Sequence, residues 1–201
     1  MIDQVPNGSD PGLRRVLVLV ALLNFAYFGV EFAVASTIGS VSLFADSIDF
    51  LEDASVNLLI LAALGWTARR RASVGMLLAA ILLVPGIATL WMAWEKFNTL
   101  VAPDPVPLSI AGLGALGVNL TCAVMLARHR HRQGSLTKAA FLSARNDALA
   151  NVAIISAGLV TALVWRSAWP DLIVGLGIAL MNADAAREVW QAARSERRAS
   201  T

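Results

Sequence analysis

The fold is decided by residues 43–53, which read LFADSIDFLED, because four acidic residues fall within eight positions of an otherwise apolar segment. They are Asp46, Asp49, Glu52 and Asp53. The surrounding run, Val41–Trp66, is long enough to cross a bilayer, since about 20 apolar residues span the hydrocarbon core as a helix. Each acid near the bilayer centre then costs roughly 2.5–3.5 kcal/mol on an insertion scale. The stretch predicts a membrane helix whose acidic residues serve a purpose other than solubility.

The composition of the whole chain also predicts a membrane protein. Of its 201 residues, 57% are hydrophobic and 15% are charged, whereas a soluble domain carries about a quarter charged residues. The formal net charge is only +2, and Cys122 is the single cysteine. These values give no basis for nucleic-acid binding or for an intramolecular disulfide framework. They exclude a soluble enzyme, and we expect no catalytic activity.

We predict an all-α integral membrane fold with six transmembrane helices, because six apolar runs are separated by turn or charge signals. The predicted helices are Leu13–Ala35, Val41–Trp66, Ser73–Trp94, Leu108–Ala127, Lys138–Trp165 and Pro170–Trp190. We expect residues 1–12 to form a cytoplasmic N-terminal segment, residues 13–192 the six-helix domain, and residues 193–201 a short cytoplasmic tail.

The distribution of Lys and Arg predicts the orientation in the membrane. Thirteen of the 16 lie on one side of the predicted helices, and the positive-inside rule places that side in the cytoplasm. Both termini are then cytoplasmic, which agrees with an even number of spans. We expect a multi-pass protein of a bacterial inner (plasma) membrane.

Two of the predicted helices carry matching polar stripes, in which side chains four residues apart share one helix face. The stripes are Asp49, Asp53 and Asn57 in the second helix and Ser143, Asp147 and Asn151 in the fifth. The match predicts two inverted three-helix halves with a binding site at their interface.

The two stripes meet near the middle of the bilayer. Asp53 lies 12 residues, or about 18 Å, from Val41 at the outer end, and Asp147 lies 9 residues, or about 14 Å, from Lys138 at the inner end. Six acids are predicted to be buried in the membrane, and Arg145 can neutralise only one of them; they are Glu31, Asp46, Asp49, Glu52, Asp53 and Asp147. We expect Glu52 to face away from the Asp53 stripe and to pair with Arg145. A cation from outside the chain is the natural partner of the other acids, and a midplane site that opens to either side is typical of a transporter.

A set of motifs follows in order along residues 13–192. They are Asn24, Glu31, Gly39, Ser42, the Ala45–Ser47 lead-in, the acids Asp49 and Asp53, the stripe Ser143, Asp147 and Asn151, and the Trp169–Asp171 opening of the last helix. In a six-span chain this set resembles the cation diffusion facilitator family, six-helix exporters that exchange divalent transition-metal ions for protons. The resemblance implies metal ligands at Asp49, Asp53, Ser143 and Asp147.

The chain departs from the family pattern in its predicted ligand set. Ser143 occupies a position that is commonly His or Asp in the family, and Asn146 is the candidate to replace it with an amide oxygen. An all-oxygen site suits harder ions such as Mn²⁺, whereas the family favours Zn²⁺; Cd²⁺, Fe²⁺ and Co²⁺ are further candidates. The metal is the substrate, and no cofactor is expected. We assign Glu31, Asp46 and Asn151 to a proton or metal path.

The chain also departs from many relatives after the sixth helix, where they carry a soluble metal-binding domain that helps dimerisation. Only about ten residues follow Trp190 here, so we expect a minimal member that forms a homodimer through membrane helices alone. His129 and His131, in the loop before the fifth helix, either capture metal at the inner entrance or belong to a solvated basic loop.

Metal and protons compete for the same carboxylate oxygens, because clustered carboxylates repel one another when all are ionised. This competition, without any GxxxxGK[ST] nucleotide motif in the chain, favours export driven by protons. The alternatives are a divalent-cation channel lined by the acids, a membrane-embedded hydrolase that uses paired aspartates, and a non-transporting partner subunit.

Overall fold

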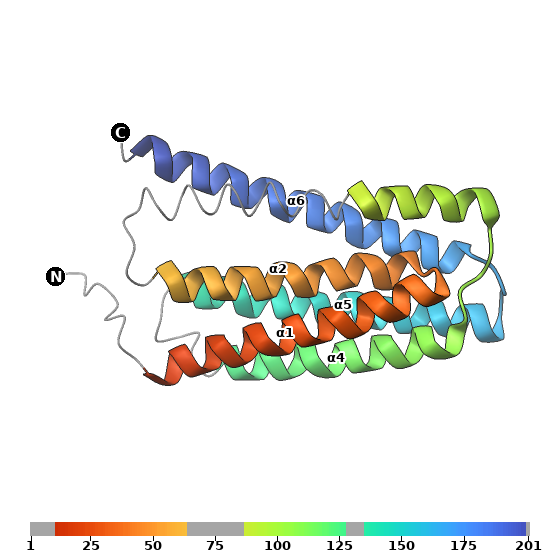
Figure 1. Ribbon diagram of the computed structural model, residues 1–201, viewed down its shortest axis with the longest axis horizontal. Coiled ribbons are helices and arrows are strands. Elements are labelled where there is room, and N and C mark those ends of the chain that lie inside the picture. Colours follow the sequence, from red (N-terminus) through yellow and green to blue (C-terminus); the bar gives the residue numbers. More distant parts are fainter. Residues whose placement is uncertain (1–10, 64–86, 128–134, 200–201) are drawn as a thin grey trace.

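The computed structural model describes the backbone of residues 11–63, 87–127 and 135–199, which form a helical bundle without strands in these ranges. Figure 1 shows the long helices lying side by side. They are α1 (Pro11–Ile38), α2 (Val41–Ala63), α4 (Pro105–Ala127), α5 (Ser135–Leu163) and α6 (Trp169–Ala199). Residues 87–99 are the described part of the third helix. The predicted all-α fold is confirmed.

The ends of the helices differ from those predicted. α1 extends beyond its predicted span at both ends, α5 ends two residues before Trp165, and α6 continues from Trp190 to Ala199 through part of the expected tail. Hydropathy indicates where the chain leaves the hydrocarbon layer, which need not be where the helix ends. A helix can extend beyond the membrane because charged residues such as Arg and Glu also favour helical backbone. Residues 64–86, which include Trp66 and Ser73, lie outside the described part of the chain.

The bundle has large apolar side chains on its surface, and in its interior polar side chains are buried beside apolar ones. In α1, Leu22 is 60% exposed and Phe25 is 59% exposed, whereas Asn24 and Glu31 are fully buried. Among the described residues, α1, α4 and residues 146–163 of α5 are long and apolar enough to cross a membrane. A surface this apolar differs from that of a soluble protein, whose exposed apolar patches are small. The chain is an integral membrane protein.

Gly39 closes the turn between α1 and α2. Its φ of 62° lies in the left-handed region that favours glycine, and Ser40 N donates to Ala35 O at 3.0 Å, as in a Schellman helix end. Ser40 Oγ then accepts from Leu43 N at 3.2 Å and caps α2. The chain therefore reverses within two residues, and α2 lies antiparallel to α1. We call this end of the bundle, with the links at residues 39–40, 100–104 and 164–168, the turn end.

Asp171, in the first turn of α6, is bonded to the start of α2 at the turn end. Its carboxylate accepts from the backbone N of Val41 at 2.9 Å and of Ser42 at 3.2 Å. It also accepts from the hydroxyls of Ser40 at 2.7 Å and Ser42 at 2.6 Å. A carboxylate at a helix N-terminus satisfies free backbone donors and complements the helix dipole, so α6 caps α2.

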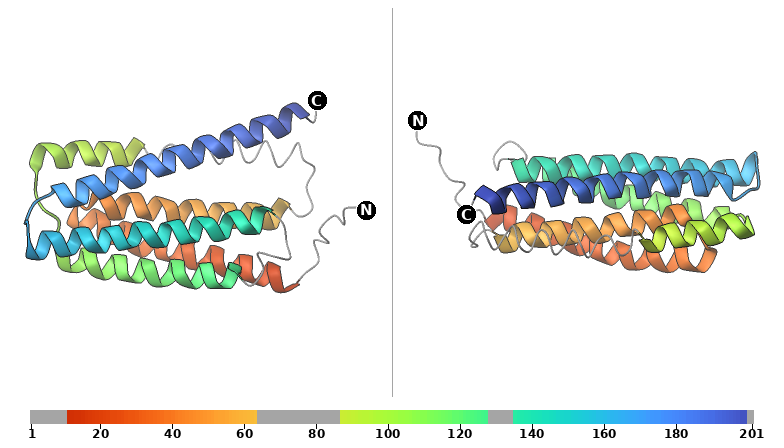
Figure 2. Two further views of the ribbon diagram at one scale, coloured as in Figure 1. Left: turned by 180° about the vertical axis from the view of Figure 1, so that it is seen from behind. Right: turned by 90° about the horizontal axis from the view of Figure 1, so that it is seen from above.

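Lys96 brings the third helix to the same place. It is only 7% exposed, and its Nζ donates to Gly39 O at 2.6 Å. The starts of α2 and α6 and the end of the third helix are thus joined at the turn end, at the right of Figure 1. Towards its C-terminus α6 leans away from α2, as Figure 1 and the reverse view in Figure 2 both show.

Gly175 lets α6 pack directly against the backbone of α2. A Cβ at this position would lie 2.7 Å from Ser42 N and 2.7 Å from the carbonyl carbon of Val41. Real Cβ atoms essentially never approach backbone this closely, so the glycine sets the separation of the two helices next to the Asp171 contact.

We expect Asp171→Asn to destabilise the protein by about 1.5–3 kcal/mol, because hydrogen bonds to charged groups contribute this much and the amide cannot accept them all. Thermal unfolding in detergent should show a lower Tm. Asp104→Asn is the matched control: Asp104 Oδ1 accepts from Val106 N at an exposed helix start, where Asn caps as well as Asp. Equal Tm values for the two variants would contradict the structural role of Asp171.

We expect Gly175→Ala to destabilise the protein by about 1–3 kcal/mol, the usual cost of overpacking. Gly177→Ala is the control two residues along the same helix, because a Cβ there meets nothing within 4 Å. Alanine favours helix over glycine by up to about 1 kcal/mol, so the control should hold or raise the Tm. Thermal unfolding measures both variants: the Tm of Gly175→Ala should fall, and the Tm of Gly177→Ala should stay the same or rise. A Tm of Gly175→Ala that does not fall would contradict the close packing.

Candidate metal site

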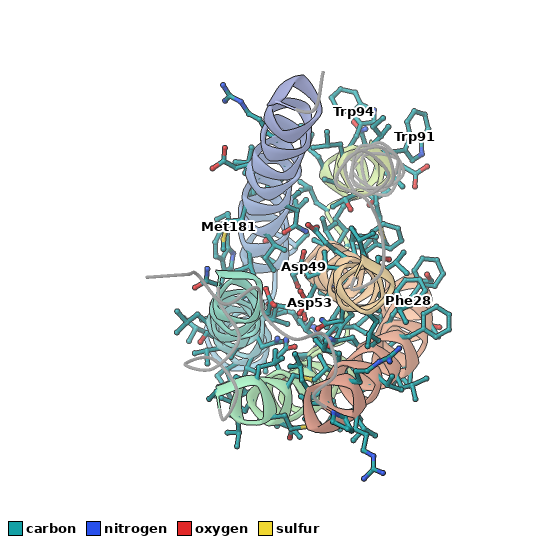
Figure 3. The ribbon with its side chains drawn as sticks, turned by 90° about the vertical axis from the view of Figure 1, so that its left-hand side faces the viewer. Phe28, Asp49, Asp53, Trp91, Trp94 and Met181 are labelled. Carbon is teal, nitrogen blue, oxygen red and sulfur yellow. The ribbon has the colours of Figure 1, made fainter. Side chains whose placement is uncertain are left out.

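A cavity of about 130 Å³ lies where α2, α5 and α6 meet. Its lining residues are Asp49, Glu52 and Asp53 from α2, Asn146 and Asp147 from α5, and Met181 and Asn182 from α6. Figure 3 shows Asp49 and Asp53 pointing from α2 into the region between α5 and α6. Four of the seven side chains carry carboxyl groups and none is Lys or Arg, so the described lining presents negative charge only.

The predicted stripes on α2 and α5 have the same local structure. Asn57 Nδ2 donates to Asp53 O at 2.7 Å, and Asn151 Nδ2 donates to Asp147 O at 2.8 Å. Each Asn is therefore fixed one turn from the Asp whose side chain lines the cavity. Asn98 Nδ2 makes the same bond to Trp94 O at 2.8 Å, so the bond is common to Asn in these helices, and the inverted repeat stays a prediction.

Four of the five predicted metal-site residues come together in this structure. Asp49, Asp53, Asn146 and Asp147 all line the cavity, although they are up to 98 positions apart in the sequence. Ser143 is on α5 but lies outside the residues whose side chains are described, as does Arg145; His129 and His131 also lie outside the described part. The roles of these residues as metal ligands stay predictions.

The carboxyl groups line the cavity without converging on one point. In the part of the chain that the structure describes, no three Asp, Glu, His or Cys side chains form a group that could hold a metal ion together. Binding an ion with short metal–oxygen bonds therefore requires the side chains, or the helices that carry them, to approach one another.

Glu31, Asp46 and Asn151, assigned to a proton or metal path, are fully buried and do not line the cavity. The carboxyl groups of Glu31 and Asp46 lie close together between α1 and α2. Among the described residues, no donor is bonded to either carboxyl group or to Asn151 Oδ1. A buried carboxylate without a partner costs several kcal/mol, so this pair needs a proton or a cation.

Sequence reasoning missed three lining residues. Glu52 was predicted to face away from Asp53, but it lines the same cavity. The prediction was wrong because α6 widens the site beyond the α2–α5 interface. Met181 and Asn182 come from α6, which was given no site residue. The available signal was the spacing of Asp171, Gly175, Ile178 and Asn182, which places four residues on one helix face.

Fold and site together define a polytopic membrane protein with an acidic cavity between its helices. The chain matches the family described as cation efflux transmembrane domain over residues 17–195. It therefore belongs to the cation efflux family, a family of transporters, and the predicted resemblance is confirmed. No curated protein matches the chain.

We expect Asp147→Asn to lower the affinity of the purified protein for divalent transition metals at least tenfold, because it removes one anionic ligand from the cavity. Titration calorimetry in detergent with Zn²⁺ and Mn²⁺ measures the change. Glu95→Gln is the control, since Glu95 is exposed on the third helix, does not line the cavity, and its carboxylate accepts a bond from Trp91 Nε1. If the metal affinity of Asp147→Asn is unchanged, Asp147 is not a metal ligand.

Proposed function

We propose that the protein is a secondary active transporter that exports divalent transition-metal cations from the cytoplasm in exchange for protons. The observation that carries the proposal is the cavity at which carboxyl groups of α2 and α5 meet. Carboxylate and amide oxygens are ligands for divalent cations, and membership of the cation efflux family supports export. Zn²⁺ is the ion expected from the family, with Cd²⁺, Mn²⁺, Fe²⁺ and Co²⁺ as further substrates.

Proton exchange follows from the charge of the cavity. Asp49, Asp53 and Asp147 carry up to three negative charges when ionised, and a dication balances only two of them. When the metal leaves, protons replace it on the same oxygens, because an apolar interior cannot hold the bare charges. Metal and protons thus occupy the site in turn, which is the requirement for an exchanger.

Glu31 and Asp46 are the proposed proton path beside the cavity. Their burial and their lack of a described donor support this role. A carboxyl pair of this kind can pass one proton between its members without water. Asn151 adds a polar atom to the α5 side, since its Oδ1 accepts no bond among the described residues.

The proposed orientation places the end of the bundle opposite the turn end in the cytoplasm. Arg14 and Arg15 are exposed at the start of α1, where the positive-inside rule places them on the cytoplasmic side. The proposal includes a homodimer formed through membrane helices in a bacterial inner membrane, with no nucleic-acid partner.

In proteoliposomes with an acidic interior, we expect the wild-type protein to accumulate Zn²⁺ or Mn²⁺ inside, as protons leave in exchange. Collapsing the pH gradient with a proton–potassium exchanger should reduce the accumulation at least tenfold. Asp49→Asn should show little uptake in either condition, while Glu95→Gln should behave like the wild type.

Other outcomes of this experiment identify the alternatives. A flux that ignores the pH gradient and only equalises the concentrations on the two sides would indicate a divalent-cation channel. The absence of flux for every ion, in a protein that remains folded, would indicate a non-transporting partner subunit.

A further inference from the structure

The face of α6 that carries Asp171 also carries a residue of the cavity. Asp171, Gly175, Ile178 and Asn182 follow one another at steps of four, three and four residues, which keeps them within about 60° of one another on a helix. The first three contact or pack into the bundle: Asp171 is bonded to α2, Gly175 lies against its backbone, and Ile178 is 4% exposed. Asn182 continues this inward face to the cavity wall.

The Asp171 contact also fixes the depth of Asn182. α2 and α6 start side by side, because Asp171 is bonded to Val41 N, and both helices run away from the turn end (Figure 1). Asp53 lies 12 residues after Val41 and Asn182 lies 11 residues after Asp171, which are rises of about 18 Å and about 17 Å. Asn182 therefore stands at the level of Asp53 on α2.

The Asn182 side chain has the chemistry of a metal ligand for hard ions. It is half-buried, it lines the cavity, and it has no hydrogen-bond partner among the described residues. Its amide oxygen is neutral, so it adds a donor without adding charge to a cavity that already holds several carboxyl groups. Ions that take six oxygen ligands gain from such a donor, whereas Zn²⁺ is satisfied by four.

We propose that Asn182 donates its amide oxygen to the transported ion and raises the preference of the site for Mn²⁺ relative to Zn²⁺. α6 is then a ligand-bearing helix together with α2 and α5, and Asp171 is the positioning residue that sets its register. This inference rests on the proposed function, because it requires the cavity to bind the transported metal.

The test is titration calorimetry of the full-length protein in detergent with Mn²⁺ and with Zn²⁺. We expect Asn182→Ala to weaken Mn²⁺ binding at least tenfold and Zn²⁺ binding less than threefold. Asn182→His replaces the oxygen with a nitrogen donor and should strengthen Zn²⁺ binding while weakening Mn²⁺ binding. The matched control is Asn98→Ala, because Asn98 is exposed on the third helix and does not line the cavity; it should leave both affinities unchanged.

The two levels of the proposal fail in different ways. If Asp147→Asn weakens both ions but Asn182→Ala changes neither, or changes both equally, the role of Asn182 is overturned and the transport site stands. If the wild type binds neither ion, the proposed function fails and the inference fails with it. If Asn182→Ala unfolds, as a lost thermal transition would show, Asn182→His retains a polar side chain at the position and gives the opposite shifts for the two ions by itself.

Discussion

The four hydrogen bonds that Asp171 accepts from Ser40 and from the first two residues of α2 determine how the site is assembled. They pin the first turns of α2 and α6 to one point, and Gly175 allows the two backbones to touch just beyond it. Residues at equal distances along the two helices therefore reach equal depths. Without this common origin, neither the acids of α2 nor the amide of α6 would have a defined place relative to the other helix.

The second constraint is electrostatic. Asp46 and Glu31 are fully buried, and the cavity beside them is lined by further acids, in a bundle whose outer surface is apolar. Such groups are costly in a membrane and persist where they bind or conduct charged species. In the proposed exchange, this cost couples metal and protons, because a dication and protons are alternative means of neutralising the same oxygens. The buried acids that weaken the apolar core are thus the groups on which the proposed exchange depends.

The fold and much of the candidate site could be predicted from the sequence because their signals are local. Apolar runs of bilayer length indicated the helices, and Asp49, Asp53 and Asp147 were conspicuous because acids are rare in such runs. Asn182 gave a weaker signal, because only its helical spacing from Asp171 marks it and an amide near the polar end of α6 is unremarkable by composition. Its place depends on the Asp171 contact, which joins residues 130 positions apart. Glu52 was misjudged because the prediction considered a site between α2 and α5 only. In the structure α6 also lines the cavity, so the face of α2 that carries Glu52 belongs to the site.

A site divided among three helices links ion binding to helix position. Asp49 and Asp53 move together because they share α2, but Asp147 and Asn182 belong to helices that reach the cavity from different directions. α6 is fixed at the turn end and leans away from α2 beyond it (Figure 2), so its distance from α2 near Asn182 depends on the tilt of the whole helix. An ion that binds more tightly when the donors are close together favours the conformation in which the helices approach. Binding energy is then available to change the tilt of a helix. A cavity with all its donors on one rigid element would offer no such coupling.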